Sequence, residues 1–373
     1  TYLLLDIKQK MKTFFSHLKK LDWIIIGSAI LLAGIGLASI YSSSIGKGDF
    51  TNFNKQIVFL IIGVGIMFIV SFMNYRLFKN DPYFLLLLWF LGVLALLGLL
   101  FFGPEIRGVK AWYRIGGISI DPVEYMKIAL LLLMAKYFSL RHVEMYRIKH
   151  ILLSAIYFGV PFALIFLQPN LGSAGLLILL WLVILLVSGI KLRHFLAIVA
   201  IGAVMFSLAW VFVLHDYQKN RIISFLEPEL DPLGIGWSQL QSKIAIGNGG
   251  IWGRGIGSGT QTQHGFLTEP HTDFIFSAIG EEFGFVGIGG VFVFFSLLLW
   301  RVFKIGMNAE SNFPRLFAIG FATLLIIQFG VNIGMNIGFL PIVGLPLPFV
   351  SYGGSSLLML FFGLGVLQSI KSR

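Results

Sequence analysis

The chain has 373 residues, of which 57% are apolar and only 12% are charged, and it carries a formal net charge of +11. A soluble domain needs about twice that share of charged residues to cover its surface, so the composition excludes a soluble enzyme. The absence of cysteine excludes disulfides, iron–sulfur clusters and zinc sites built on cysteine.

Apolar runs separated by short polar breaks occupy most of the chain, and many reach the ~20 residues that a helix needs to cross a bilayer. The sequence therefore predicts an all-α integral membrane protein with about ten transmembrane helices in one domain, residues 22–373. Residues 1–21 form a basic segment, either an interfacial amphipathic helix or a plain basic flank. The predicted spans are residues 22–43, 55–75, 83–102, 121–139, 150–168, 171–189, 193–214, 273–300, 315–337 and 350–370.

The basic residues orient these spans. When both termini are placed in the cytoplasm, Lys and Arg favour the cytoplasmic side by roughly two to one, as the positive-inside rule requires. Basic cytoplasmic loops explain the net charge, and we expect no nucleic acid partner.

The longest connection, residues 215–272, joins the seventh and eighth spans on the outer side. Connections longer than ~15 residues are usually functional or disordered. Its glycine-rich stretch, residues 247–259, predicts turns, whereas Trp237, Trp252 and Phe266 are too apolar for a disordered segment. We expect this loop to pack onto the outer mouth of the bundle.

The fourth span opens with a strong helix start, with Asp121 as the N-cap, Pro122 at the first position and Glu124 at the third. Glu124 and Lys127 are three residues apart and can pair on one face of the helix. Two interpretations are open, and they do not exclude each other. The pair is a structural element, or the helix N-terminus with Lys127 holds an anion such as a diphosphate.

The eighth span opens around Asp273, where loop becomes helix. A half-buried carboxylate at such a position can act as a general base. The alternative is that Asp273 or Thr272 merely caps the helix. Glu281 and Glu282 follow about 12 Å further along the predicted helix, and at least one of them needs a polar partner inside the bundle.

Other polar patterns carry no recognisable site. His215, His264 and His271 lack the spacing of a zinc site, and residues 253–259 lack the strand and the Gly-Lys-Ser/Thr ending of a phosphate loop. The dense prolines and glycines of residues 341–354 predict irregular backbone, which at membrane depth either forms a tight outer loop or lines a cavity.

Several motifs in order resemble the SEDS family (shape, elongation, division and sporulation), from about residue 20 to the C-terminus. Within the family, the chain is most similar to the cell-elongation member. The motifs are Gln168–Gly172, Tyr217–Gly234, Gln241–Gly247, Gly259–Gln261, Glu269–Phe276, Glu281–Gly284 and Pro346–Gly354.

The resemblance implies ten transmembrane helices in the bacterial inner membrane and a peptidoglycan glycosyltransferase activity on lipid II, the undecaprenyl-diphosphate-linked disaccharide pentapeptide. It implies a class B penicillin-binding protein and other elongation-complex membrane proteins as partners. The family's essential aspartate corresponds to Asp273, and its membrane glutamate–lysine pair to Glu124 and Lys127. Two positions depart from the family pattern: Asp121-Pro122-Val123-Glu124 replaces Gln-Pro-Ser-Glu, and Asn170 replaces an aspartate.

The implied reaction needs a base for the acceptor's GlcNAc 4-hydroxyl, which is Asp273, and positive charge or a divalent cation (Mg²⁺ or Mn²⁺, with Asp273 as a possible ligand) for the diphosphate leaving group. A lipid II transporter and a non-catalytic scaffold for a transpeptidase are the alternatives. The expected supporting residues, besides Glu124 and Lys127, are Arg107, Arg114, Asn170, Arg221, Gln241, Ser242, Lys243, Glu269, His271, Thr272 and Ser351.

Overall fold

A computed structural model describes residues 15–105, 108–140, 148–214, 216–227 and 234–373. Residues 15–20 are helical, but most of the predicted N-terminal segment lies outside the described residues. A two-stranded antiparallel hairpin, β1 (Tyr113–Ile115) and β2 (Ile118–Ile120), precedes α6. The helices are α2 (Trp23–Lys47), α3 (Thr51–Phe72), α4 (Arg76–Asn80), α5 (Pro82–Phe102), α6 (Pro122–Ser139), α7 (Ile148–Leu167), α8 (Leu171–Val187), α9 (Leu192–Phe212), α10 (Asp216–Leu226), α11 (Ile235–Gly249), α12 (Thr260–Gln263), α13 (Ile275–Met307), α14 (Asn312–Ile337) and α15 (Gly354–Lys371).

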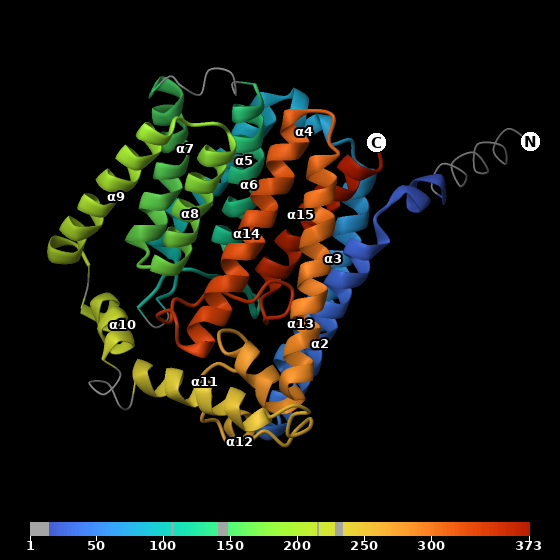
Figure 1. The fold of residues 1–373 in the computed structure, drawn as a ribbon, viewed down its shortest axis with the longest axis vertical. Helices are drawn as coiled ribbons and strands as arrows, with labels where there is room; N and C mark the ends of the chain where they lie inside the picture. The colour runs from blue at the N-terminus through green and yellow to red at the C-terminus, as the bar shows by residue number, and fades with distance from the viewer. Residues whose placement is uncertain (1–14, 106–107, 141–147, 215, 228–233) are drawn as a thin grey trace, which may run out of the picture.

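The predicted multi-pass, all-α architecture is confirmed. Among the described residues, eight helices are long and apolar enough to cross a membrane, namely α2, α3, α5, α7, α9, α13, α14 and α15. The other two predicted spans are α6, which carries three charged residues, and α8, a shorter apolar helix of 17 residues. Both lie within the same bundle (Figure 1).

The bundle has two distinct ends. We call the end at which α2 begins and α15 finishes the terminal end, and the opposite end the loop end. The helices α10, α11 and α12 of the long connection gather at the loop end (Figure 1). This arrangement confirms that the connection packs onto the bundle.

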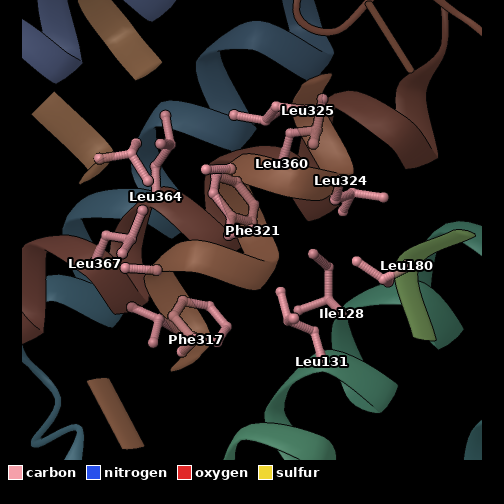
Figure 2. Packing of buried hydrophobic residues seen from close by; sticks show 14 of the residues in the cluster. Ile128, Leu131, Leu180, Phe317, Phe321, Leu324, Leu325, Leu360, Leu364 and Leu367 are labelled. Carbon is pink, nitrogen blue, oxygen red and sulfur yellow. The ribbon is translucent and has the colours of Figure 1, made fainter. Parts of the chain in front are cut away.

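The core of the bundle is built around α14, which packs against α6, α8, α13 and α15. Figure 2 shows Phe317, Phe321 and Leu324 of α14 lying among leucine and isoleucine side chains of α6, α8 and α15. Close approach depends on glycine, because a Cβ on Gly320 would lie 2.2 Å from the Leu131 side chain. Lipid supplies no hydrophobic drive between helices, so tight packing of this kind holds the bundle together.

The predicted start of the eighth span needs correction. Although α13 runs from Ile275 to Met307, its helical backbone is interrupted at Gly284, where φ is 65° and ψ is −160°. A Cβ there would lie 2.2 Å from the backbone nitrogen of Gly253, so glycine also permits the loop to approach. The uninterrupted part of this apolar helix is therefore residues 285–307, and residues 275–283 form a separate helical segment before it.

The long connection is more helical than its glycines suggest. Gly247 and Gly249 lie inside α11 rather than in turns, and the turns begin at Gly250. Residues 341–353 contain no helix, as their prolines and glycines predict, and α15 begins at Gly354 rather than at residue 350.

Candidate active site

Asp273 lies at the loop end in a turn formed by residues 269–274, and its side chain is half-buried. The turn closes through hydrogen bonds from the Thr272 and Phe274 backbone amides to the Glu269 carbonyl, 3.2 and 3.3 Å. The N-cap of α13 is Phe274, so the alternative that Asp273 or Thr272 caps this helix is wrong. The cap position therefore does not account for a carboxylate at residue 273.

The irregular loop before α15 and the end of α2 hold the residues that precede Asp273. The His271 carbonyl accepts a hydrogen bond from the Tyr352 amide at 2.8 Å, and the Thr272 carbonyl accepts one from Ser351 Oγ at 2.7 Å. His271 is buried, and its Nδ1 lies 2.9 Å from Ser43 Oγ. His271 thus positions the turn through main-chain and side-chain contacts, and Thr272 does so through its carbonyl.

Two asparagines of α14 hold the main chain of Asp273 itself. The Asp273 carbonyl accepts hydrogen bonds from Asn336 Nδ2 at 2.9 Å and from Asn332 Nδ2 at 3.2 Å. Asn332 Nδ2 also donates to the Leu345 carbonyl at 2.8 Å. Three successive carbonyls of the turn, those of residues 271 to 273, are therefore fixed, which holds the main chain that carries the Asp273 carboxylate.

Asn336 also connects the turn to α11. Its Oδ1 accepts from Ser277 Oγ at 2.6 Å, and Ser242 Oγ donates to the Asn336 carbonyl at 2.7 Å. Ser242, Ser277 and Asn336 are all fully buried. A buried polar network whose members are satisfied rigidifies its surroundings.

The loop of residues 341–353 forms one side of the site. Ser351 Oγ accepts from the Leu347 amide at 2.8 Å, and Gln56 of α3 bonds both the Ser351 carbonyl and the Gly353 amide. A Cβ on Gly344 would lie 3.7 Å from Asp273 Oδ2, so this glycine lies directly beside the carboxylate. This segment therefore packs directly against the Asp273 turn.

Two of the three described residues other than glycine that have a positive φ lie in this region, and the third is Pro169 before α8. Glu269 and Phe349 have positive φ angles of 52° and 64°, which are uncommon for residues other than glycine. One begins the turn that contains Asp273, and the other lies two residues before Ser351. Strained backbone of this kind clusters at functional sites, where the surrounding structure must hold it.

The predicted pair on α6 is present. Lys127 Nζ lies 2.6 Å from Glu124 Oε1, and the Lys127 side chain is 1% exposed. The predicted cap is also confirmed, because Asp121 accepts from the Val123 amide at 2.8 Å. The Asp121 amide donates to Ser355 Oγ, which ties the start of α6 to α15. Lys127 is thus buried and paired with Glu124, as the structural interpretation predicts.

Glu281 and Glu282 are buried, but not within the membrane crossing as predicted. The break at Gly284 leaves them at the loop end, where both carboxylates find polar partners. Glu281 accepts from the backbone amides of Gln261 and Thr262 at 2.8 and 2.9 Å. Glu282 accepts from Ser42 Oγ at 2.6 Å and from a glutamine side chain of α12. Hydrogen bonds to the two carboxylates therefore connect α12 to α13 and α2 to α13.

The remaining predicted residues lie on other elements. Arg114 is exposed on β1, Arg221 is half-buried on α10, and Gln241 is buried on α11. Lys243 is exposed on α11, with its side chain against Gly338 at the end of α14. Asn170 is the N-cap of α8 and accepts from the Ser173 amide. Arg107 lies outside the described residues.

Sequence reasoning missed Asn332 and Asn336, although a signal was available. Two asparagines four residues apart lie on one face of a helix, and both interrupt an apolar span where polar groups are costly.

The fold and this site define a class of protein: a multi-pass helical membrane protein that holds a half-buried aspartate in a rigid turn at the loop end. The chain matches the family described as "Cell cycle protein" (FtsW, RodA and SpoVE) over residues 21–373. The chain belongs to this family, which is the SEDS family.

Relatives and solved structures agree with this assignment. The peptidoglycan glycosyltransferase MrdB of Escherichia coli is 36% identical over 345 residues, 92% of either chain. Stage V sporulation protein E of Bacillus subtilis is 34% identical over 359 residues, 94% of this chain and 96% of that one. The crystal structure of Thermus thermophilus RodA has a TM-score of 0.70 at 29% identity, covering 94% of this chain and 96% of that one. A chain from a peptidoglycan synthase complex that coordinates polymerization and crosslinking has a TM-score of 0.79 at 31% identity, covering 94% and 97%.

Proposed function

We propose that the protein is a peptidoglycan glycosyltransferase that polymerises lipid II into glycan strands during cell elongation, with Asp273 as the catalytic base. Relatives that it matches over nine-tenths of its length carry the name of this activity. The observation that carries the proposal is the half-buried Asp273, whose turn is fixed through three successive carbonyls. A base must be held in place to be effective, because small displacements reduce the rate steeply.

In the proposed reaction, the 4-hydroxyl of the acceptor's GlcNAc attacks the anomeric carbon of the donor's MurNAc. Asp273 takes the hydroxyl proton as the new glycosidic bond forms and the bond to the lipid diphosphate breaks. Attack from the face opposite the leaving group inverts the anomeric configuration. The diphosphate leaves as an anion and needs no protonating acid.

Positive charge must stabilise the departing diphosphate. Of the predicted cations that the structure describes, Lys243 and Arg114 are exposed, Arg221 is half-buried, and Lys127 is buried against Glu124. Arg107 also remains a candidate for binding the diphosphate. We therefore assign diphosphate binding to the exposed cations and a structural role to Lys127. The other candidates for substrate binding are Arg221, Gln241 and Glu269.

A divalent cation would need the substrate itself as a ligand. Among the described residues, no group of three or more His, Asp or Glu side chains could hold a metal ion. Mg²⁺ is commonly bound by one or two carboxylates together with substrate phosphates. Asp273 is the residue that could contribute to such a site, where the ion would neutralise diphosphate charge.

We further propose a place in the bacterial inner membrane, with the terminal end in the cytoplasm and Asp273 on the outer side. The two-to-one distribution of Lys and Arg supports this orientation. We propose a class B penicillin-binding protein as a partner, together with other membrane proteins of the elongation complex. The similar chain from a complex that coordinates polymerization and crosslinking supports a transpeptidase partner.

The test is to give lipid II to the purified protein in liposomes, alone and with a class B penicillin-binding protein, and to measure glycan strands and lipid movement. We expect polymer whose formation is abolished by Asp273→Ala without loss of folding. Movement of lipid II across the bilayer without polymer would identify a transporter. Increased crosslinking of preformed strands without polymer would identify a scaffold.

A further inference from the structure

A cavity of about 570 Å³ lies at the terminal end of the bundle, whereas α10, α11 and α12 lie at the loop end. Three elements that are distant in sequence surround it: the short helix α4, the end of α6 and the start of α14. Its polar lining includes Lys79 of α4, Lys136 of α6, and residues 310–312 before and within the first turn of α14.

Two lysines converge on this cavity without a carboxylate partner. Lys136 donates to the Lys79 carbonyl, and Lys79 donates to Ser311 Oγ at 3.4 Å. Neither ammonium forms an ion pair in the described part of the chain. Both lysines are half-buried, so water screens them less than it screens charges on an open surface.

The acidic residues nearby do not neutralise this charge. Asp81 follows α4 directly, but its carboxylate caps α5 by accepting from the Tyr83 and Phe84 amides. Glu310 lines the cavity, but it is exposed and forms no ion pair with either lysine. The cavity therefore keeps an excess of positive charge.

The start of α14 adds donors to the same cavity. Its N-cap, Ser311, has an extended backbone, but its side chain does not cap the helix. Ser311 Oγ instead accepts from Lys79. Pro314 has no N–H, so the amides of Asn312 and Phe313 are the first-turn donors left for another acceptor. The positive end of the helix dipole faces the cavity.

We propose that this cavity is a binding site for a phosphate group, held by Lys79, Lys136 and the uncapped first turn of α14. Lysines and helix N-termini are both common phosphate ligands. The phosphate belongs either to the headgroup of an anionic phospholipid or to a soluble phosphate compound. Leu140, which lines the cavity, is 68% exposed, and Leu77 on α4 is 54% exposed, so acyl chains could pack beside the headgroup.

The experiment measures binding of phosphatidylglycerol to the purified full chain in detergent by native mass spectrometry. The variant Lys79→Gln/Lys136→Gln should weaken phosphatidylglycerol binding about tenfold or more. Lys79→Arg/Lys136→Arg retains the charge and should bind within a few-fold of wild type. The matched control is Lys304→Gln/Lys371→Gln, which removes two exposed lysines at the same end but outside the cavity. This control should bind as wild type does.

A second arm distinguishes the source of the phosphate. Excess inorganic phosphate that displaces phosphatidylglycerol, or that binds alone in a manner dependent on Lys79 and Lys136, indicates a site open to soluble phosphates. Failure of inorganic phosphate to compete assigns the site to lipid. Thermal melting of each variant establishes that it is folded. Equal phosphatidylglycerol binding by the folded glutamine variant and by the control, or the absence of any phosphate binding to wild type, overturns the proposal.

Discussion

The two halves of α14 have different structural roles. The first half packs apolar side chains such as Phe317, Phe321 and Leu324 into the centre of the bundle (Figure 2). The last half is polar on one buried face, where Asn332 and Asn336 hold the main chain of Asp273. One continuous helix thus anchors the site to the most tightly packed part of the protein, so a rigid scaffold positions the reactive carboxylate.

The largest expected effect on stability comes from a buried polar pair outside α14. Lys127→Met leaves Glu124 as an uncompensated buried charge, which should cost about 3–5 kcal/mol. The double variant Glu124→Gln/Lys127→Met should recover most of this loss. The free energy of unfolding in detergent, measured for the single and the double variant, tests both expectations. A stable Lys127→Met protein that fails to bind lipid II would instead assign Lys127 to the substrate and undo its structural role.

Leu324→Ala tests the packing half of α14. The side chain is 1% exposed, and its truncation should destabilise the protein by about 3 kcal/mol through the cavity that it leaves. We expect polymerisation below the melting temperature to stay within about twofold of wild type, since the Asp273 turn does not depend on this contact. A loss of activity in a protein that remains folded would contradict the claim that the first half of α14 packs the core while the second half positions Asp273.

Asn336→Leu tests the polar half. It removes a donor to the Asp273 carbonyl and the acceptor for Ser277 Oγ. The turn is then no longer held in its position relative to α14. We expect a loss of about a hundredfold in kcat, because displacing a catalytic group by about 1 Å costs that much. KM should change less, because Asn336 acts through Asp273 and does not touch the substrate.

The same helix offers a matched control for this variant. Gln328 lies eight residues earlier, is fully buried, and its amide has no hydrogen-bond partner in the described structure. Gln328→Leu should therefore leave both kcat and stability near those of wild type. Equal losses of kcat in Gln328→Leu and Asn336→Leu would mean that any apolar substitution on this face is harmful. Such a result would contradict the positioning role of Asn336.

The smallest effect is expected at Asn170, where this chain departs from the family's aspartate. Because the side chain caps α8, Asn170→Ala should cost about 1 kcal/mol of stability. Asn170→Asp should match wild type in both melting temperature and polymerisation, since either residue can cap. A large change in activity for Asn170→Asp would show that charge at this position matters to the reaction.

The spans could be predicted from sequence because each is a long apolar run, and the cap and ion pair at the start of α6 follow from local spacing. The break at Gly284 could not, since glycine is common in such helices and only the approach of Gly253 requires this one to be non-helical. That break is why Glu281 and Glu282 were placed too deep. The family motifs identified Asp273. Its contacts with Asn332 and Asn336 could not be predicted, because these residues are 59 and 63 positions away in the sequence and hydrophobic periodicity indicates only local structure.

The most direct measurement is the rate at which Asp273→Asn polymerises lipid II in liposomes, compared with wild type and with Asp49→Asn. Asp49 is a matched control, because it is an exposed carboxylate at the loop end, and hydrogen bonds from Thr51 lower its pKa. A general base contributes about 10²–10⁴-fold, so Asp273→Asn should be slower by that factor, while lipid II binding, melting temperature and the Asp49→Asn rate stay near wild type. Polymerisation by folded Asp273→Asn within a few-fold of wild type would contradict the assignment of Asp273 as the base.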